Sequence, residues 1–74
     1  MIEYKGTNYN NAHGSPFDRG TADAYYGRKA NPHWLKYGNE VYRIDKFHMN
    51  EKEIEAYYAG YDFATENGDE KDYR

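Results

Sequence analysis

The sequence predicts a mainly α fold, in which two short helices pack as a helical hairpin and are joined by a long linker. Residues 15–28 and 50–66 each begin with a helix-capping pattern, and each carries apolar residues at helical spacing. A chain of 74 residues has room for one domain. We therefore expect a flexible N-terminal arm over residues 1–14, a single two-helix domain over 15–66 and an acidic C-terminal tail over 67–74.

The first predicted helix has a clear start and a clear stop. Ser15 is a favourable N-cap, and Pro16 suits the first helical position because proline has a fixed φ and no N–H to satisfy. Gly27 can adopt the left-handed conformation that ends many helices. Asp23 is expected to point away from the buried face. That face is predicted to carry Phe17, Thr21, Ala24, Tyr25 and Arg28.

The second predicted helix begins with a capping box. The Asn50 side chain can accept a hydrogen bond from the backbone of Glu53, whose own side chain can bond back to Asn50. Gly60, in the middle of this helix, costs up to about 1 kcal/mol relative to alanine, so its presence indicates the close approach of another element. We expect the first helix to make that approach, because its Gly20, Ala24 and Gly27 offer contact with small residues. The residues at helical spacing on the packed face are Ile54, Tyr57, Tyr58, Tyr61 and Ala64.

The first 14 residues carry turn signals instead of helical ones. They are rich in Asn and Gly, which favour turns and extended chain. Ile2 and Tyr4 alternate with charged residues, as in a brief edge strand. A flexible arm is nevertheless the preferred interpretation.

The linker contains one hairpin signal. Gly38-Asn39 lies between two runs of aromatic and β-branched residues and fits a two-residue turn. Such a hairpin pairs Tyr37 with Glu40 and Leu35 with Tyr42. A structured loop is the alternative.

The composition excludes several classes of function. Without cysteine there is no disulfide, no thiolate zinc site and no thiol nucleophile. No apolar run approaches the length of a membrane span and no signal-peptide pattern is present, so we expect a cytoplasmic protein without membrane contact. Ser15, the lone serine, is explained as a cap, and the three histidines match no metal-ligand spacing. We expect no enzymatic activity, no cofactor, no metal and no small-molecule substrate.

The distribution of charge and aromatic residues indicates binding. The net charge of −3 is uneven, because residues 1–50 hold seven Lys or Arg against five Asp or Glu and residues 51–74 hold three against eight. Cations interleaved with aromatic rings suit RNA phosphates and stacked bases. The alternative is that these cations pair with the acids of the C-terminal third. The candidate residues for binding RNA or another partner are Arg19, Tyr26, Arg28, Lys29, His33, Trp34, Lys36 and Arg43.

The acidic end of the chain supports a different hypothesis. Clustered carboxylates beside tyrosines can occupy a basic groove on another protein. This predicts an inhibitor of a host protein, of the kind that phages encode, whereas the alternative is simply a solvated chain end. The residues of this acidic face are Asp62, Glu66, Asp69, Glu70 and Asp72.

Three short motifs follow one another between Asp18 and Tyr61. They are Asp18-Arg19-Gly20-x-Ala22-x-x-x-Tyr26-Gly27-Arg28, Asn31-Pro32-His33 and Ala56-Tyr57-x-Ala59-Gly60-Tyr61. The pattern resembles that of ribosome modulation factor and related small proteins of bacteria and their phages. The resemblance implies two linked helices that bind the small ribosomal subunit and promote its hibernating, dimerised state, with Arg19, Arg28 and Lys29 at the family's basic positions. The chain departs from the family in its acidic charge and its longer linker.

Two functional hypotheses therefore follow from the sequence. The first is a non-enzymatic protein, similar to ribosome modulation factor, that binds the ribosome or another RNA-containing machine. The second is an acidic, tyrosine-rich inhibitor that binds a host protein. Self-association is a further expectation, because surplus aromatic surface also suits a homo-oligomer.

Overall fold

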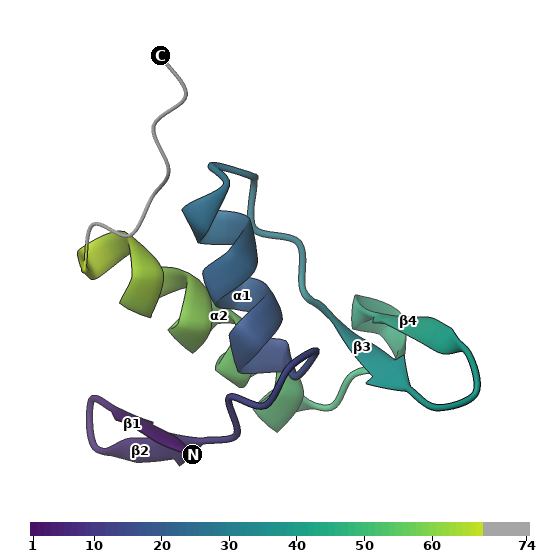
Figure 1. Ribbon diagram of the computed structural model, residues 1–74. Coiled ribbons are helices and arrows are strands. Elements are labelled where there is room, and N and C mark those ends of the chain that lie inside the picture. The colour runs from purple at the N-terminus through teal and green to yellow at the C-terminus, as the bar shows by residue number, and fades with distance from the viewer. Residues whose placement is uncertain (68–74) are drawn as a thin grey trace.

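The protein is an α+β domain in a computed structural model, which describes residues 1–67. The elements follow the order β1, β2, α1, β3, β4, η1 and α2, and the strands form two separate two-stranded antiparallel sheets. Helix accounts for 43% of these residues and strand for 24%. The prediction of a mainly α helical hairpin is therefore wrong, because strands precede the first helix and also fill the linker. Figure 1 shows the two helices side by side, with the two hairpins at separate positions around them.

Both helices begin where the capping signals predicted. In α1 (Pro16–Tyr25), the Ser15 side chain accepts a hydrogen bond from the backbone of Asp18, with Pro16 at the first position. In α2 (Glu51–Glu66), Asn50 and Glu53 form the complete reciprocal capping box. Gly27 has a φ of 68°, the left-handed conformation expected at the end of the first helix. Helix α1 nevertheless ends at Tyr25, three residues before the predicted boundary.

The expected close approach of the two helices at Gly20 and Gly60 is confirmed. A Cβ atom on Gly20 would overlap the carbonyl oxygen of Tyr57, and a Cβ on Gly60 would overlap that of Phe17. The side chains of Phe17 and Tyr57 are fully buried beside this contact. We call the contact the glycine seam. It lets two backbones meet without intervening side chains and places two large rings in the core.

The first 14 residues contain a hairpin. Strands β1 (Ile2–Tyr4) and β2 (Thr7–Tyr9) pair in antiparallel register, and the turn residues Lys5 and Gly6 have φ values of 50° and 82°. Two consecutive positive φ angles define a type I′ turn. The strongest sequence signals for this turn are Asn-Gly and Asp-Gly, and Lys5-Gly6 is neither. Here the hairpin is held by tertiary contacts: Tyr9 stacks on Phe17 with ring centroids 5.3 Å apart, and Tyr4 packs edge-on against Phe63 at 5.7 Å.

The linker contains a second hairpin, but the predicted register is wrong by one residue. Strands β3 (His33–Tyr37) and β4 (Val41–Asp45) pair Tyr37 with Val41 and Leu35 with Arg43. The loop has three residues instead of two, closed by the Gly38 N–H donating to the carbonyl of Glu40 at 3.2 Å. A 3-10 turn, η1 (Lys46–His48), then leads to α2.

The shift of register decides where Arg43 lies. Directly opposed residues in a sheet project from the same face. The predicted register would have placed Arg43 on the face of Trp34, whereas the observed pairing places it on the face of His33 and Leu35. This is the face on which the candidate site is built.

Candidate nucleic-acid interface

One polar hollow of about 290 Å³ gathers most of the cations predicted for binding. We call it the basic hollow. It holds four cations against one carboxylate, a net charge of +3, on a chain whose formal charge is −3. Five of the eight candidate residues lie together here. The lining residues are Arg19, Asp23, Arg28, Lys29, Asn31, His33 and Arg43.

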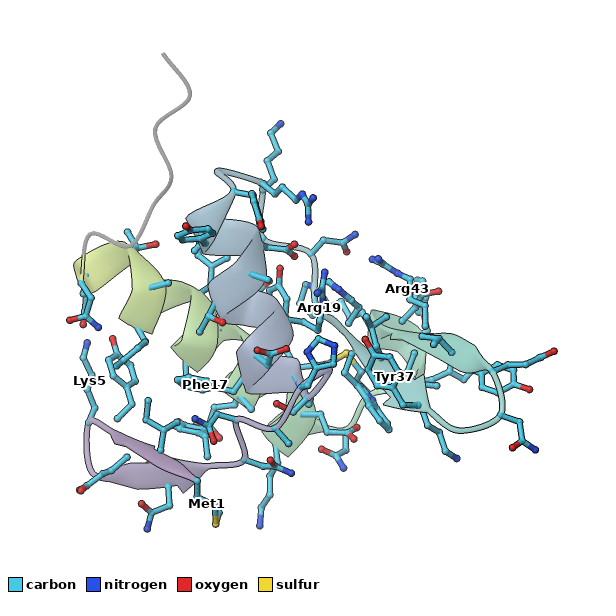
Figure 2. The ribbon with its side chains drawn as sticks, viewed as in Figure 1. Met1, Lys5, Phe17, Arg19, Tyr37 and Arg43 are labelled. Carbon is cyan, nitrogen blue, oxygen red and sulfur yellow. The ribbon has the colours of Figure 1, made fainter. Side chains whose placement is uncertain are left out.

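Four segments supply these side chains. Arg19 comes from the middle of α1, and Arg28 and Lys29 follow the left-handed turn at its end. His33 begins β3, and Arg43 reaches the same side from β4 because of the register described above. In Figure 2, Arg19 lies between the helices and the hairpin, and Arg43 stands on the hairpin beyond it. The hollow therefore forms only when the hairpin packs beside α1.

A buried hydrogen-bond network supports the floor of the hollow. Asp23 is only 4% exposed, although the helical pattern placed it away from the core. Its carboxylate accepts a hydrogen bond from the hydroxyl of the fully buried Tyr57. The backbone N–H of Asn31 donates to the same hydroxyl at 2.9 Å. Tyr57 thus ties the end of the first helix to the start of the linker.

Burial strongly raises the pKa of Tyr57 above its ordinary value. Loss of water around the ring disfavours the phenolate, and the nearby Asp23 carboxylate adds to this through its hydrogen bond and its negative charge. The Asn31 N–H acts in the opposite direction. The phenol therefore remains a hydrogen-bond donor in the folded protein.

His33 is held in a single tautomer by its two neighbours. Its Nδ1 lies 2.8 Å from the carbonyl oxygen of Asn31, which can only accept a hydrogen bond. Its Nε2 lies 3.1 Å from Arg19 Nε, which can only donate. The ring therefore carries its proton on Nδ1 and is neutral. Because a neutral imidazole is the partner of Arg19 in this contact, the full positive charge of the guanidinium stays in the hollow.

The arginines of the hollow form ion pairs with carboxylates that are close to them in the sequence. Arg28 Nη1 lies 3.5 Å from Asp23 Oδ1, and Arg43 Nε lies 2.9 Å from Asp45 Oδ1. Within residues 1–67, neither arginine pairs with an acid of α2, and no carboxylate lies within 4.0 Å of Lys29 Nζ. The alternative that these cations are neutralised by the acids of the C-terminal third is therefore not seen in this part of the chain.

The other three candidate residues lie outside the basic hollow. Tyr26 is at its margin, with its ring 5.2 Å from the guanidinium of Arg28. Trp34 and Lys36 instead line a separate hollow of about 400 Å³ beside Tyr37. The indole N–H of Trp34 is buried and lacks a hydrogen-bond partner among the described residues. The candidate residues that were grouped from the sequence as one binding site thus lie at two separate hollows.

The acidic face predicted for the C-terminal end is only partly described. Asp69, Glu70 and Asp72 lie outside the described residues. Glu66 is engaged by the N-terminal hairpin: it accepts a hydrogen bond from the Tyr4 hydroxyl at 2.7 Å and lies 3.1 Å from Lys5 Nζ. These two contacts lower the pKa of Glu66. Asp62 lines a shallow hollow that also contains Lys5.

Sequence reasoning missed Asp23, Asn31 and Tyr57 as parts of the site. Asp23 follows Phe17 and Gly20 at successive three-residue intervals, so the stripe of Phe17, Gly20 and Ala24 could have indicated its burial. Nothing in the sequence indicated that a tyrosine 34 positions away would be its partner. That pairing is set by the glycine seam.

The described residues contain no cluster of three His, Asp or Glu side chains suited to a metal ion. Among these residues there is also no helix with the length and apolar character needed to cross a membrane. Comparisons with protein-family models, curated proteins and solved structures found no match to this chain.

Proposed function

We propose that this protein is a non-enzymatic RNA-binding protein that docks on the ribosome, or on another cytoplasmic RNA-containing assembly, through the basic hollow. One observation carries the proposal: four cations and a single buried carboxylate surround one hollow on a chain that is otherwise acidic. An acidic protein can bind a polyanion only where its cations are concentrated locally.

The cations of the hollow suit phosphate groups. Three of the four are arginines, whose planar guanidinium groups can form two parallel hydrogen bonds to phosphate oxygens. Arg19 is oriented by His33, and the chain at Arg28 is held by the Tyr61 hydroxyl, which donates to the Arg28 carbonyl. The Arg19 guanidinium and the backbone at Arg28 are thus held in place before a ligand arrives, which lowers the entropy lost on binding.

An aromatic ring at the margin adds a second element of RNA recognition. Tyr26 is 45% exposed and lies against the Arg28 guanidinium. Exposed rings and guanidinium planes are the surfaces on which unpaired bases stack. Phosphate contacts inside the hollow and a base on Tyr26 are therefore compatible with one strand of RNA.

The resemblance to ribosome modulation factor supports the same residues. Arg19, Arg28 and Lys29 match the family's basic positions, and all three line the basic hollow. The acidic charge of this chain argues for a more localised contact than that of a strongly basic protein. Such a contact involves few phosphates, so its affinity should depend only moderately on salt.

Co-sedimentation with purified small ribosomal subunits at low salt tests the proposal. Replacing Arg28 and Lys29 together by Glu should abolish co-sedimentation, because the hollow then changes from net positive to net negative. The matched control replaces Lys46 and Lys52 by Glu, which changes the total charge equally outside the hollow and should retain most of the binding. A protein that does not sediment with the subunits would overturn the ribosome as its target.

Pull-down before and after nuclease treatment separates the two functional classes. Partners that disappear with the RNA support the proposal. A protein partner that survives nuclease, and that still binds the variant with Glu at positions 28 and 29, would instead support the inhibitor hypothesis. That hypothesis is not favoured by Glu66, which is already engaged by Tyr4 and Lys5.

A further inference from the structure

The outer edge of β4 is an open strand edge. The opposite edge of the sheet is partly covered, because the N–H of Leu35 in β3 donates to the carbonyl of Gly14 at 2.8 Å. For β4, no hydrogen bond within residues 1–67 joins its outward-facing backbone to another element. A lone two-stranded hairpin is only marginally stable in water, and an open edge is a template for a further strand.

The bonding pattern identifies the backbone groups that face outward. Since Leu35 donates away from β4, the Leu35–Arg43 pair is a non-hydrogen-bonded pair of the ladder. The Gly38 N–H, which donates to Glu40, continues the same alternation at the turn. The backbone groups of Val41, Arg43 and Asp45 therefore point to the open side. We call these three residues the β4 edge.

We infer that the β4 edge pairs with the β4 edge of a second copy of this chain, forming a symmetric four-stranded antiparallel sheet centred on Ile44. In this register Arg43 of each copy lies opposite Asp45 of the other. Both residues have outward-facing backbone groups, so each pair can exchange two main-chain hydrogen bonds. The sheet then contains four new backbone hydrogen bonds, two from each Arg43–Asp45 pair.

The charges of Arg43 and Asp45 favour the register centred on Ile44. Arg43 and Asp45 lie on one face of the strand, with side chains 48% and 61% exposed, and they form an ion pair within the chain at 2.9 Å. Centring on Ile44 places each guanidinium opposite a carboxylate of the other copy. Centring on Arg43 would place the two guanidinium groups opposite each other, which is unfavourable. The edge is therefore complementary to itself in one register.

Two exposed apolar side chains lie at either end of the paired residues. Val41 begins β4, and Phe47 lies in η1, beyond the last residue of the strand. Phe47 is 96% exposed and Val41 is 56% exposed. The two-fold axis is perpendicular to the sheet, so both basic hollows face the same side.

A strand-edge interface of this size belongs to the weak class, so sedimentation velocity from micromolar concentrations up to about 1 mM is the appropriate measurement. The wild-type chain should show a reversible monomer–dimer equilibrium. Arg43→Asp or Asp45→Arg alone places like charges opposite each other and should weaken dimerisation by at least about tenfold. The double variant, Arg43→Asp with Asp45→Arg, restores opposite charges and should restore the dimer.

Asp45→Pro tests the backbone pairing. The φ of Asp45 is −83°, close to the angle that proline requires, and its N–H points to the open side, so the β3–β4 ladder is retained. This variant should be monomeric at all concentrations, with an unchanged circular dichroism spectrum. Asp45→Asn keeps the N–H and should retain part of the dimerisation. A wild-type chain that is monomeric at about 1 mM, or a dimer that survives Asp45→Pro, would overturn the inference.

Discussion

The glycine seam and the β3–β4 hairpin show opposite solutions to packing in one small domain. In the seam the backbones of α1 and α2 meet so closely that a methyl group has no space, and Phe17 and Tyr57 are 1% and 0% exposed. In the hairpin Val41 and Tyr42 are more than half exposed, and β4 packs chiefly on β3. The difference indicates that the seam holds the fold together while the hairpin remains available for partners.

Gly60→Ala should produce the largest loss of stability. The new methyl group would overlap the backbone of Phe17, which cannot move without separating the helices. We expect a loss of about 3 kcal/mol in the free energy of unfolding, larger than the gain in helix propensity of about 1 kcal/mol. For a domain of this size, that corresponds to a decrease in Tm of roughly 10–20 °C in a thermal melt.

Gly38→Ala is the matched control from the hairpin. The nearest atom to its added methyl group would be the Glu40 carbonyl oxygen, at an ordinary contact distance of 3.9 Å. Its stability should change by less than about 0.5 kcal/mol. If the two alanine variants melted at the same temperature, the seam would not be the centre of stability.

At alkaline pH, ionisation of the buried Tyr57 hydroxyl should lower the free energy of unfolding. Because its pKa is raised in the folded state, the resulting stabilisation is fully present below the unfolded value of about 10 and is lost as the pH rises towards the folded value. Tyr57 alone should contribute a loss of up to about 1.4 kcal/mol per pH unit in this range. Denaturant unfolding at a series of pH values between 9 and about 12 measures this slope.

The control for this titration is Tyr57→Phe. It removes the ionisable hydroxyl and should reduce the alkaline slope by the contribution of one group, although the variant is less stable at neutral pH because Asp23 and Asn31 lose a partner. Tyr58→Phe removes a hydroxyl at a position 41% exposed and is the matched control for the substitution. An equal slope in all three proteins would contradict the role assigned to Tyr57.

The smallest effect is expected at the ion pair that holds the N-terminal hairpin. Lys5→Met should raise the pKa of Glu66 towards its ordinary value, because one of the two contacts that lower it is lost. The stabilisation from Glu66 is present above its unfolded pKa and is lost as the pH falls through the lower folded value. A titration followed by NMR measures the shift, with Lys52→Met as the control.

The melting temperature of Lys5→Met should hardly change, because both partners are on the surface and solvent screens the pair. The hairpin is held mainly by Tyr4 and Tyr9 against Phe63 and Phe17. A large decrease in Tm would show that the ion pair, and not these rings, fixes the hairpin.

The sequence alone determined the helix starts and the glycine seam. Ser15 and Asn50 satisfy backbone groups within the same helical turn, so neighbouring residues suffice to predict them. Gly60 is unfavourable in a helix unless something approaches closely, so its presence implied the seam. The grouping of Arg19, Arg28 and Lys29 also follows from their proximity along the chain.

Only the tertiary structure decided the N-terminal hairpin, the register of β3 and β4 and the burial of Asp23. Each depends on a contact between residues distant in sequence: Tyr4 on Phe63, the β3–β4 hairpin beside α1, and Tyr57 on Asp23. When the register of a strand moves by one residue, each of its side chains changes to the other face of the sheet. In this hairpin, the register depends on whether the loop has two residues or three. Local sequence preferences are too similar to choose between such loops, so the position of Arg43 is set by the packing of the whole domain.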